Sequence, residues 1–155
     1  MRRNDREITD KEQIKSFISA EKIMRIGFND SGDVYIVPVN YGFAEADGQY
    51  TFYFHGAMAG RKYELAQAYP SVGFEIDGKY QLMSADTACG HSAKFQSVIG
   101  TGDLSLIEGA AEKKAALEYV MKQAAGRTGL EYDEAVLSRT AVFKLEVKTM
   151  SCKAK

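Results

Sequence analysis

Three runs of β-forming residues follow one another between residues 24 and 55, and only short turn signals separate them. The runs read MRIGFND, VYIVPVNYGF and YTFYFH, and their connections contain SGD at 31–33 and Asp-Gly at 47–48. Such Ser-Gly and Asp-Gly signals are typical of tight turns between neighbouring antiparallel strands. The first third of the chain is therefore predicted to form consecutive antiparallel strands.

Further strand patterns follow in the second half of the chain. SVGFEID and GKYQLMS read as two strands across an Asp77-Gly78 turn, and 94–108 reads as one long strand that Gly-x-Gly bends. VFKLEVKTM alternates apolar and charged residues, as a half-buried strand does. About six strands in this order predict a mainly β fold, a closed or nearly closed antiparallel barrel with peripheral helices, rather than a doubly wound parallel sheet.

Three segments between the strands carry helix signals. TDKEQIKSFISAEK begins with Thr9 three residues before Glu12, which is the spacing of a capping box. GRKYELAQAY at 60–69 reads as a short helix that Pro70 ends. AAEKKAALEYVMKQAAG has a helical apolar stripe and a terminal glycine, Gly126.

Composition limits the class of protein. The 155 residues suit a single domain over 1–155, and 45% hydrophobic with 26% charged residues is ordinary for a globular chain. A formal net charge of −1 gives no electrostatic reason to expect nucleic-acid binding. Two cysteines, no apolar signal segment and no long apolar run predict a cytoplasmic protein with free thiols and no membrane span.

Arg61 and Lys62 lie at the predicted start of the second helix. Cations there oppose the helix dipole at a cost of about 0.3–1 kcal/mol. A bound phosphate would offset this cost, because the free N–H groups, Gly60 and two cations together form an anion pocket. On spacing alone, two solvated surface charges are the simpler explanation of the pattern.

Two other segments carry polar groups that could bind a ligand. Pro38 interrupts a strand pattern, which indicates either an irregular edge strand or a ligand-facing break with Asn40 and Tyr41 beside it. His55 follows a strand and could bind an anion, orient a ligand or transfer a proton. A structural hydrogen-bonding role is the simpler alternative for this histidine.

Metal and thiol chemistry find little support in the sequence. Cys89 and His91 are separated by one glycine, but two histidines and two cysteines in the whole chain are too few for a zinc site of ordinary spacing. No local pattern supplies a base to activate Cys89, so a thiol packed beside the barrel is expected. The full GxGxxG spacing of a dinucleotide-binding turn is absent.

The order of the motifs VPVNYGF at 37–43, FHGAMAGRK at 54–62 and SVIGTG at 97–102 resembles a known family. Over nearly the whole chain the sequence is similar to flavin-binding split-barrel proteins related to pyridoxamine 5'-phosphate oxidase. It most resembles the branch of the 5-nitroimidazole-resistance (Nim-type) proteins. The resemblance implies a six-stranded antiparallel split β-barrel that forms a homodimer and binds flavin mononucleotide (FMN) at the subunit interface, with both chains contributing.

The resemblance also implies roles for individual residues of the chain. The strand at 37–41 would lie along the flavin ring, Gly60, Arg61 and Lys62 would hold the phosphate, and His55 would lie beside the flavin and the substrate as the catalytic candidate. Family members often carry tyrosine and arginine where this chain has Phe95 and Gln96. The implied cofactor-binding set is Val37, Pro38, Val39, Asn40, Tyr41, Phe54, His55, Ala57, Gly60, Arg61, Lys62, Phe95, Gln96 and Ser97.

Two functions are compatible with this resemblance. The first is an FMN-dependent oxidoreductase that reduces a small electrophile such as a nitroaromatic compound. The alternative is a non-catalytic flavin- or haem-binding or sensing module of the same fold. Oxidation of vitamin B6 is not expected, because the chain ends in VKTMSCKAK, without the substrate-binding segment of those oxidases.

Overall fold

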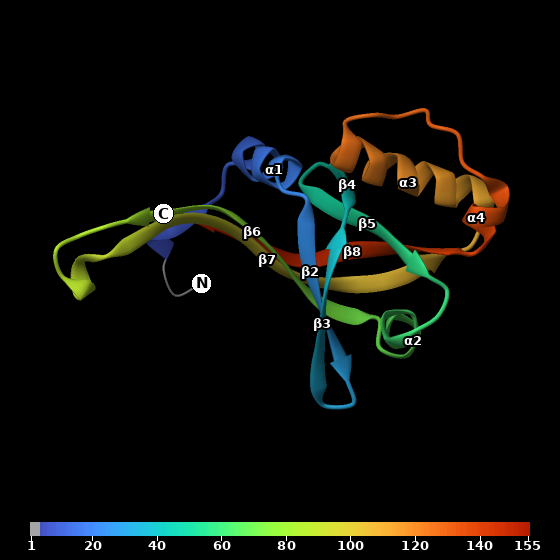
Figure 1. The fold of residues 1–155 in the computed structure, drawn as a ribbon, viewed down its shortest axis with the longest axis horizontal. Helices are drawn as coiled ribbons and strands as arrows, with labels where there is room; N and C mark the ends of the chain where they lie inside the picture. The colour runs from blue at the N-terminus through green and yellow to red at the C-terminus, as the bar shows by residue number, and fades with distance from the viewer. Residues whose placement is uncertain (1–3) are drawn as a thin grey trace.

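The computed structural model describes residues 4–155 and is built around one antiparallel sheet (Figure 1). Its strand order is β3-β2-β6-β7-β8-β5-β4, and β1 pairs with β8 outside this path. The strands are β1 (Glu7–Ile8), β2 (Ile23–Asp30), β3 (Asp33–Asn40), β4 (Gly42–Ala46), β5 (Gln49–Ala57), β6 (Ser71–Met83), β7 (Ser92–Ile107) and β8 (Thr140–Ala154). The mainly β, antiparallel prediction is confirmed.

The sheet is bent into a barrel that does not close. β3 and β4 are its two edges, and no strand pairing joins them among the described residues. The run 34–43, predicted as one strand, divides at Tyr41, so that its two halves lie at opposite edges of the sheet. Tyr41 itself is fully buried. Within residues 4–155 there are eight strands where about six were expected, because this run divides, the two-residue β1 is added, and SVGFEID and GKYQLMS form the single strand β6.

Both early turn predictions are confirmed by the backbone. Gly32 and Gly48 have φ angles of 104° and 85°, and the residues before them, Ser31 and Asp47, also have positive φ. Two successive positive φ angles are what a tight turn with the twist of a β-hairpin requires. Glycine is well suited to these positions because it has no side chain to oppose that conformation.

The predicted turn at Asp77-Gly78 is wrong. β6 continues through this pair, and the register against β7 shifts between Gly78 and Gln81, with Lys79 at a φ of 55°. The Asp-Gly pair therefore precedes a β-bulge within the strand and does not form a turn, because cross-strand pairing with β7 continues on both sides of it. The β6–β7 hairpin instead extends as a long arm away from the barrel (Figure 1). Cys89 is exposed near the tip of the arm, so its expected packing beside the barrel is also wrong.

In the described part of the chain, four α-helices lie around the sheet: α1 (Lys11–Ala20), α2 (Arg61–Ala68), α3 (Ala110–Ala125) and α4 (Glu134–Ser138), with short 3₁₀ turns at Asn4–Arg6 and Ala88–Gly90. Asp10 caps α1 by accepting a hydrogen bond from the Gln13 amide at 2.8 Å, so the predicted cap at Thr9 is one residue too early. Gly126 ends α3 in the left-handed conformation, as predicted. The five-residue α4 is too short to show a helical period in the sequence.

The core has two parts. The larger lies inside the bent sheet and contains an aromatic cluster around Phe52, and the smaller lies between α3 and the outer side of β5 and β8. Gly42 of β4 sets the distance of α3 from the sheet, because a Cβ atom there would lie 2.1 Å from a backbone carbon of Tyr119. α3 therefore contacts β4 directly, backbone against backbone.

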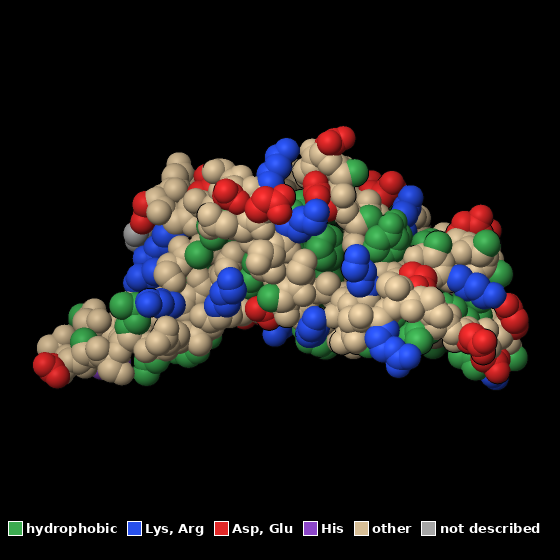
Figure 2. All heavy atoms as spheres, turned by 90° about the horizontal axis from the view of Figure 1, so that it is seen from above, with side chains coloured by type: hydrophobic (Ala, Val, Ile, Leu, Met, Phe, Trp, Pro, Cys, Tyr) green, Lys and Arg blue, Asp and Glu red, His purple; other side chains and the backbone are tan. Residues whose placement is uncertain are grey.

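The side of the molecule seen in Figure 2 is not dominated by charge of one sign. Lys and Arg side chains alternate with Asp and Glu side chains over the side seen in Figure 2. Within residues 4–155, no helix combines the length and the apolar character that crossing a membrane would require. Both cysteines are free thiols, as predicted.

Candidate functional site

The start of α2 carries the predicted anion-binding residues. Gly60 is the N-cap of α2 with a φ of 92°, a conformation that favours glycine, and no side chain caps the helix. The Glu64 amide bonds the Gly60 carbonyl, so the amides before it remain directed outward from the helix start. These outward-directed N–H groups at the start of α2 are suited to binding an anion.

Arg61 is already paired within the chain. Its Nε donates to Asp30 Oδ2 at 2.7 Å, and its Nη2 bonds the same oxygen. Asp30 ends β2, and its side chain is largely buried. The intramolecular carboxylate therefore offsets the helix-dipole cost that the sequence left unexplained for Arg61.

Lys62 differs from Arg61 because it has no carboxylate partner among the described residues. Its Nζ donates to the His55 carbonyl at 3.3 Å and lies 5.7 and 5.6 Å from the ring centres of Phe54 and Phe143. Burial lowers the pKa of Lys62. A half-buried ammonium with only a carbonyl and two aromatic faces as partners is an incompletely neutralised charge.

Gly56 allows Lys62 to take this position. A Cβ atom at Gly56 would lie 2.7 Å from Lys62 Nζ and 2.9 Å from its Cε. The side chain of Lys62 thus lies directly across the backbone of β5. Asp30 and Phe143 also shape the site, yet no motif contained them, because their roles depend on strand register and not on local spacing. Gly56 lies within the motif FHGAMAGRK, but the motif gave it no role.

His55 lies on the opposite face of β5 from Phe54. It pairs with Val142, which packs in the smaller core beneath α3, whereas Phe54 points into the larger core. Neither ring nitrogen of His55 hydrogen-bonds to another residue within 4–155. Partial burial, and then the charge of Lys62, lower the pKa of the imidazole below its ordinary value of 6.5. The free chain therefore presents a neutral imidazole at neutral pH.

We expect an NMR titration of the flavin-free protein to place the His55 midpoint below 6.5. The pKa of His55 is lower in the folded than in the unfolded state, so the neutral imidazole favours folding at pH values above the unfolded pKa. This stabilisation is lost as the pH falls through the folded pKa. Lys62→Met should raise the midpoint by removing a nearby positive charge. The His91 resonance, from the distant arm, is the internal reference. An unchanged His55 midpoint in Lys62→Met would contradict the assigned electrostatic coupling.

β3 is an edge strand, which confirms the interpretation of Pro38 as a residue of an edge strand. Pro38 and Asn40 face outward, and the Asn40 side-chain amide donates to the Lys22 carbonyl at 3.0 Å. Tyr41 is fully buried, and its hydroxyl donates to the Ile18 carbonyl at 2.6 Å. Burial raises the pKa of Tyr41. The Tyr41 phenol is thus occupied, and the backbone of β3 is the part of this segment left for a ligand.

Phe95, Gln96 and Ser97 lie at the start of β7, far from His55 within one chain. His55 pairs with Val142, and Val142 pairs with Ile107, ten residues further along β7 than Ser97. At about 3.3 Å per residue this is roughly 33 Å along the strand. The structure therefore brings together α2 and the end of β5, and it leaves the β7 segment apart.

Ser97 nevertheless has an unexplained polar group. Its hydroxyl is buried without a hydrogen-bond partner within residues 4–155, whereas the neighbouring Gln96 side chain donates to Cys152 Sγ at 3.8 Å. Phe95 is held by backbone bonds to Lys155 and lies 5.6 Å from Lys153 Nζ. A buried hydroxyl without a partner is uncommon and marks a position where a ligand or partner group could bond.

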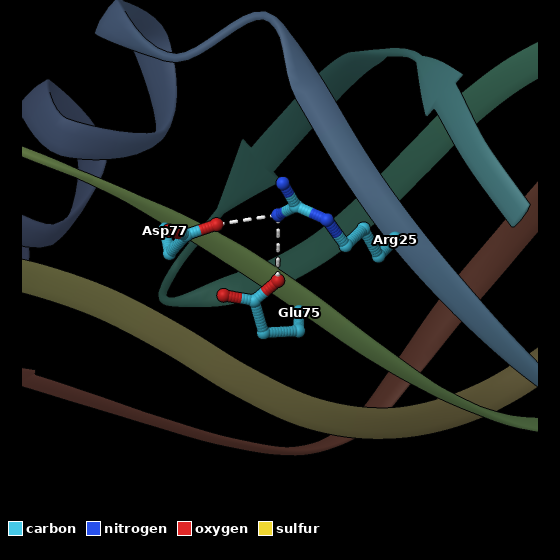
Figure 3. Close-up of polar contacts among 3 residues, drawn as sticks. All are labelled: Arg25, Glu75 and Asp77. Carbon is cyan, nitrogen blue, oxygen red and sulfur yellow. Dashed lines mark hydrogen bonds and ion pairs between the residues drawn. The ribbon is translucent and has the colours of Figure 1, made fainter. Parts of the chain in front are cut away.

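A charged cluster lies on the outward face of β2 and β6. Figure 3 shows Arg25 between Glu75 and Asp77; its Nη1 is 3.1 Å from Glu75 Oε2 and also bonds Asp77. Beside the cluster, Gly27 and Gly73 leave a shallow groove of about 350 Å³, which is flanked by Ile36 and Ile99. These two isoleucines are 61% and 50% exposed. No sequence motif predicted this face, because its residues come from four strands.

The bent, open antiparallel sheet with a glycine-initiated helix at its end is that of the split-barrel proteins. The sequence matches the family model described as pyridoxamine 5'-phosphate oxidase over residues 10–154, and the chain belongs to this family. The predicted fold and family are confirmed. The comparison with functionally curated proteins gives no significant match.

Solved structures agree with this assignment. A candidate 5-nitroimidazole antibiotic resistance protein from Bacteroides thetaiotaomicron is 28% identical, with a TM-score of 0.82 over 96% of this chain and 86% of that one. A flavocytochrome from Azotobacter vinelandii is 22% identical, with a TM-score of 0.78 over 96% and 69%. A FAD- and haem-binding protein from Mycobacterium smegmatis is 13% identical, with a TM-score of 0.81 over 97% and 73%. The last two show likeness of fold alone.

Proposed function

We propose that this chain binds FMN and acts as an oxidoreductase that reduces a small electrophile such as a nitroaromatic compound. The observation that carries the proposal is Lys62, a half-buried ammonium without a carboxylate partner in the described chain, two residues after Gly60, the glycine that opens α2. A phosphate monoester supplies the missing negative charge. The similarity to a candidate nitroimidazole-resistance protein supports the choice of substrate class.

The residues present fit a flavin phosphate. The first-turn amides after Gly60 are directed outward, Lys62 offers a charge, and Arg61 is within the same helix turn. Ser97, whose buried hydroxyl has no partner in residues 4–155, lies apart from these groups in one chain and would contribute only from a second copy. A bound flavin supplies the redox chemistry, and the chain supplies binding, orientation and a proton-carrying group. His55 is the group proposed to hold that proton, because its ring makes no competing hydrogen bond within the described chain.

The test of this proposal is a spectroscopic titration of the purified protein with FMN, followed by turnover. We expect a flavin absorption spectrum with saturable binding, and steady oxidation of reduced nicotinamide when a nitroaromatic compound is added. A protein that takes up no flavin would contradict the cofactor proposal. Bound flavin without turnover on nitro compounds, quinones or dyes would contradict the enzymatic part and support a non-catalytic binding module.

We further propose that the active form is a homodimer with FMN at the subunit interface. Within one chain, the β7 segment lies about 33 Å along the strand from the level of His55. A second copy can bring its β7 segment to the α2 site of the first. The groove between Ile36 and Ile99 is an exposed apolar surface on the same outward face as Ser97, which suits it to contact that second copy.

Replacing Ile99 by arginine tests the dimer. Ile99→Arg introduces a charge at the groove, so we expect light scattering to show the mass of one chain and FMN affinity to fall by at least about tenfold. Val136→Arg is the matched control, because Val136 is also exposed but lies in α4, away from the groove. A single-chain mass for the unaltered protein with flavin bound would refute the shared site.

A further inference from the structure

A second cavity lies at the end of the barrel opposite the arm. Its volume is about 440 Å³, and it lies where α2, α3 and α4 approach the ends of β7 and β8. This volume is within the range of small-molecule sites. Its wall is mainly apolar and includes Met58, Tyr63, Leu106, Ile107, Leu137 and Ala141. Neither Arg61, Lys62 nor His55 lines it, so it is separate from the predicted flavin phosphate site.

The one buried charge on this wall is Lys113. The residue is only 7% exposed, in the first part of α3, although lysine is rarely buried without a partner. Its Nζ donates to the Thr140 carbonyl at 2.8 Å, and within residues 4–155 it has no other hydrogen bond and no ion pair. An ammonium group has three N–H donors, so two of them are without a protein acceptor in the described chain.

Two carboxylates also line the cavity, but neither neutralises Lys113. Glu134 pairs with Lys114, on the outer side of α3, and Glu108 is exposed. Their negative charges lie near water, where screening is strong, whereas Lys113 is buried. A ligand with one negative charge would be attracted to Lys113, and a highly charged anion would be repelled by the two glutamates. The contact of Lys113 with Thr140 fixes α3 to the start of β8, but it uses only one donor.

We propose that this cavity binds a small monocarboxylate with an apolar or aromatic body. The carboxylate accepts hydrogen bonds from the free N–H groups of Lys113, and the apolar body packs against Leu106, Ile107 and Leu137. A charge-assisted bond of this kind is favoured because it neutralises a buried cation. The assignment does not depend on flavin, although Met58 and Tyr63 place the cavity beside the chain segment that opens α2.

Benzoate is the probe, and calorimetry together with amide NMR shifts on the full chain is the measurement. We expect one benzoate per chain in both flavin-free and FMN-loaded protein, with shifts at residues that line the cavity. Benzamide, which has the same shape without the charge, should bind at least about tenfold more weakly. Lys113→Met should weaken benzoate binding to a similar extent, and Lys113→Arg should retain most of it. Lys122→Met is the matched control, because Lys122 is an exposed lysine at the other end of α3 that does not line the cavity, and it should leave binding unchanged.

Several outcomes overturn the proposal. The proposal is wrong if benzoate does not bind at millimolar concentrations. It is also wrong if benzoate and benzamide bind the unaltered protein equally well. Equal benzoate affinity of the folded Lys113→Met variant and the unaltered protein would contradict it as well. If Lys113→Met fails to fold, the comparison of benzoate with benzamide still decides. Because the flavin-free protein is used, a negative result here is separate from a failure of FMN to bind.

Discussion

A chain with Arg61→Gln and Lys62→Met together is expected to bind FMN about 10²- to 10⁴-fold more weakly than the unaltered protein. Each charge-assisted contact to a phosphate contributes about 1.5–3 kcal/mol, and each 1.4 kcal/mol changes the dissociation constant tenfold. Fluorescence titration with FMN measures this loss. Riboflavin, which lacks the phosphate, is the matched ligand, and its affinity should change little.

The single variants Arg61→Gln and Lys62→Met should differ in how much FMN affinity they lose. Lys62→Met should cause the larger loss, because Lys62 has no carboxylate partner in the described chain, whereas Arg61 is paired with Asp30. Asp30→Asn removes that competing carboxylate, so FMN affinity should stay the same or rise. Equal losses for FMN and riboflavin in the double variant, or no loss for either, would mean that the phosphate binds elsewhere.

Phe52→Ala is expected to lower the free energy of unfolding by about 3–5 kcal/mol. Phe52 is fully buried at the centre of the aromatic cluster, with ring centres of Phe74 and Tyr41 at 5.2 and 5.6 Å. Truncation removes these contacts and leaves a cavity that rigid neighbouring strands cannot close. The total free energy of unfolding of a typical protein is about 5–15 kcal/mol, so this loss would be a large fraction of it. Urea unfolding followed by circular dichroism measures the change.

Two further variants keep this prediction testable. Phe52→Leu retains part of the buried volume and should cost clearly less than Phe52→Ala, so it remains measurable if the alanine variant does not fold. Val136→Ala truncates an exposed side chain in α4 and should change the stability by no more than about 0.5 kcal/mol. Similar losses for Phe52→Ala and Val136→Ala would show that the aromatic cluster does not organise the core.

Local sequence signals predicted most of the elements. The turns at 31–33 and 47–48, the helices after Gly60 and before Gly126, and the alternating strand at the end of the chain all depend on a few adjacent residues. The Asp77-Gly78 signal failed because pairing with β7 continued through it, so a local preference was overridden by a long ladder of cross-strand contacts. The division of 34–43 at Tyr41 was missed for a related reason, since it shows only in the pairing of the two halves with different strands, β2 and β5.

The candidate site was predicted in part. The residue types at Gly60, Arg61 and Lys62 indicate an anion pocket from the sequence alone, and the position of His55 after a strand makes it a candidate as well. The different states of the two cations could not be predicted. Asp30 is 31 residues from Arg61, and Phe143 is 81 residues from Lys62, so their contacts exist only after the strands pair.

The sequence by itself determined the antiparallel character of the sheet, the helix that opens at Gly60 and the family to which the chain belongs, because each rests on short-range patterns or on ordered motifs. Only the tertiary structure decided that Arg61 is neutralised by Asp30 while Lys62 is not, that Ser97 lies far from His55, and that Lys113 is buried beside a cavity. The physical reason is that charge pairing and burial depend on strand register and helix docking, which join residues far apart in the chain.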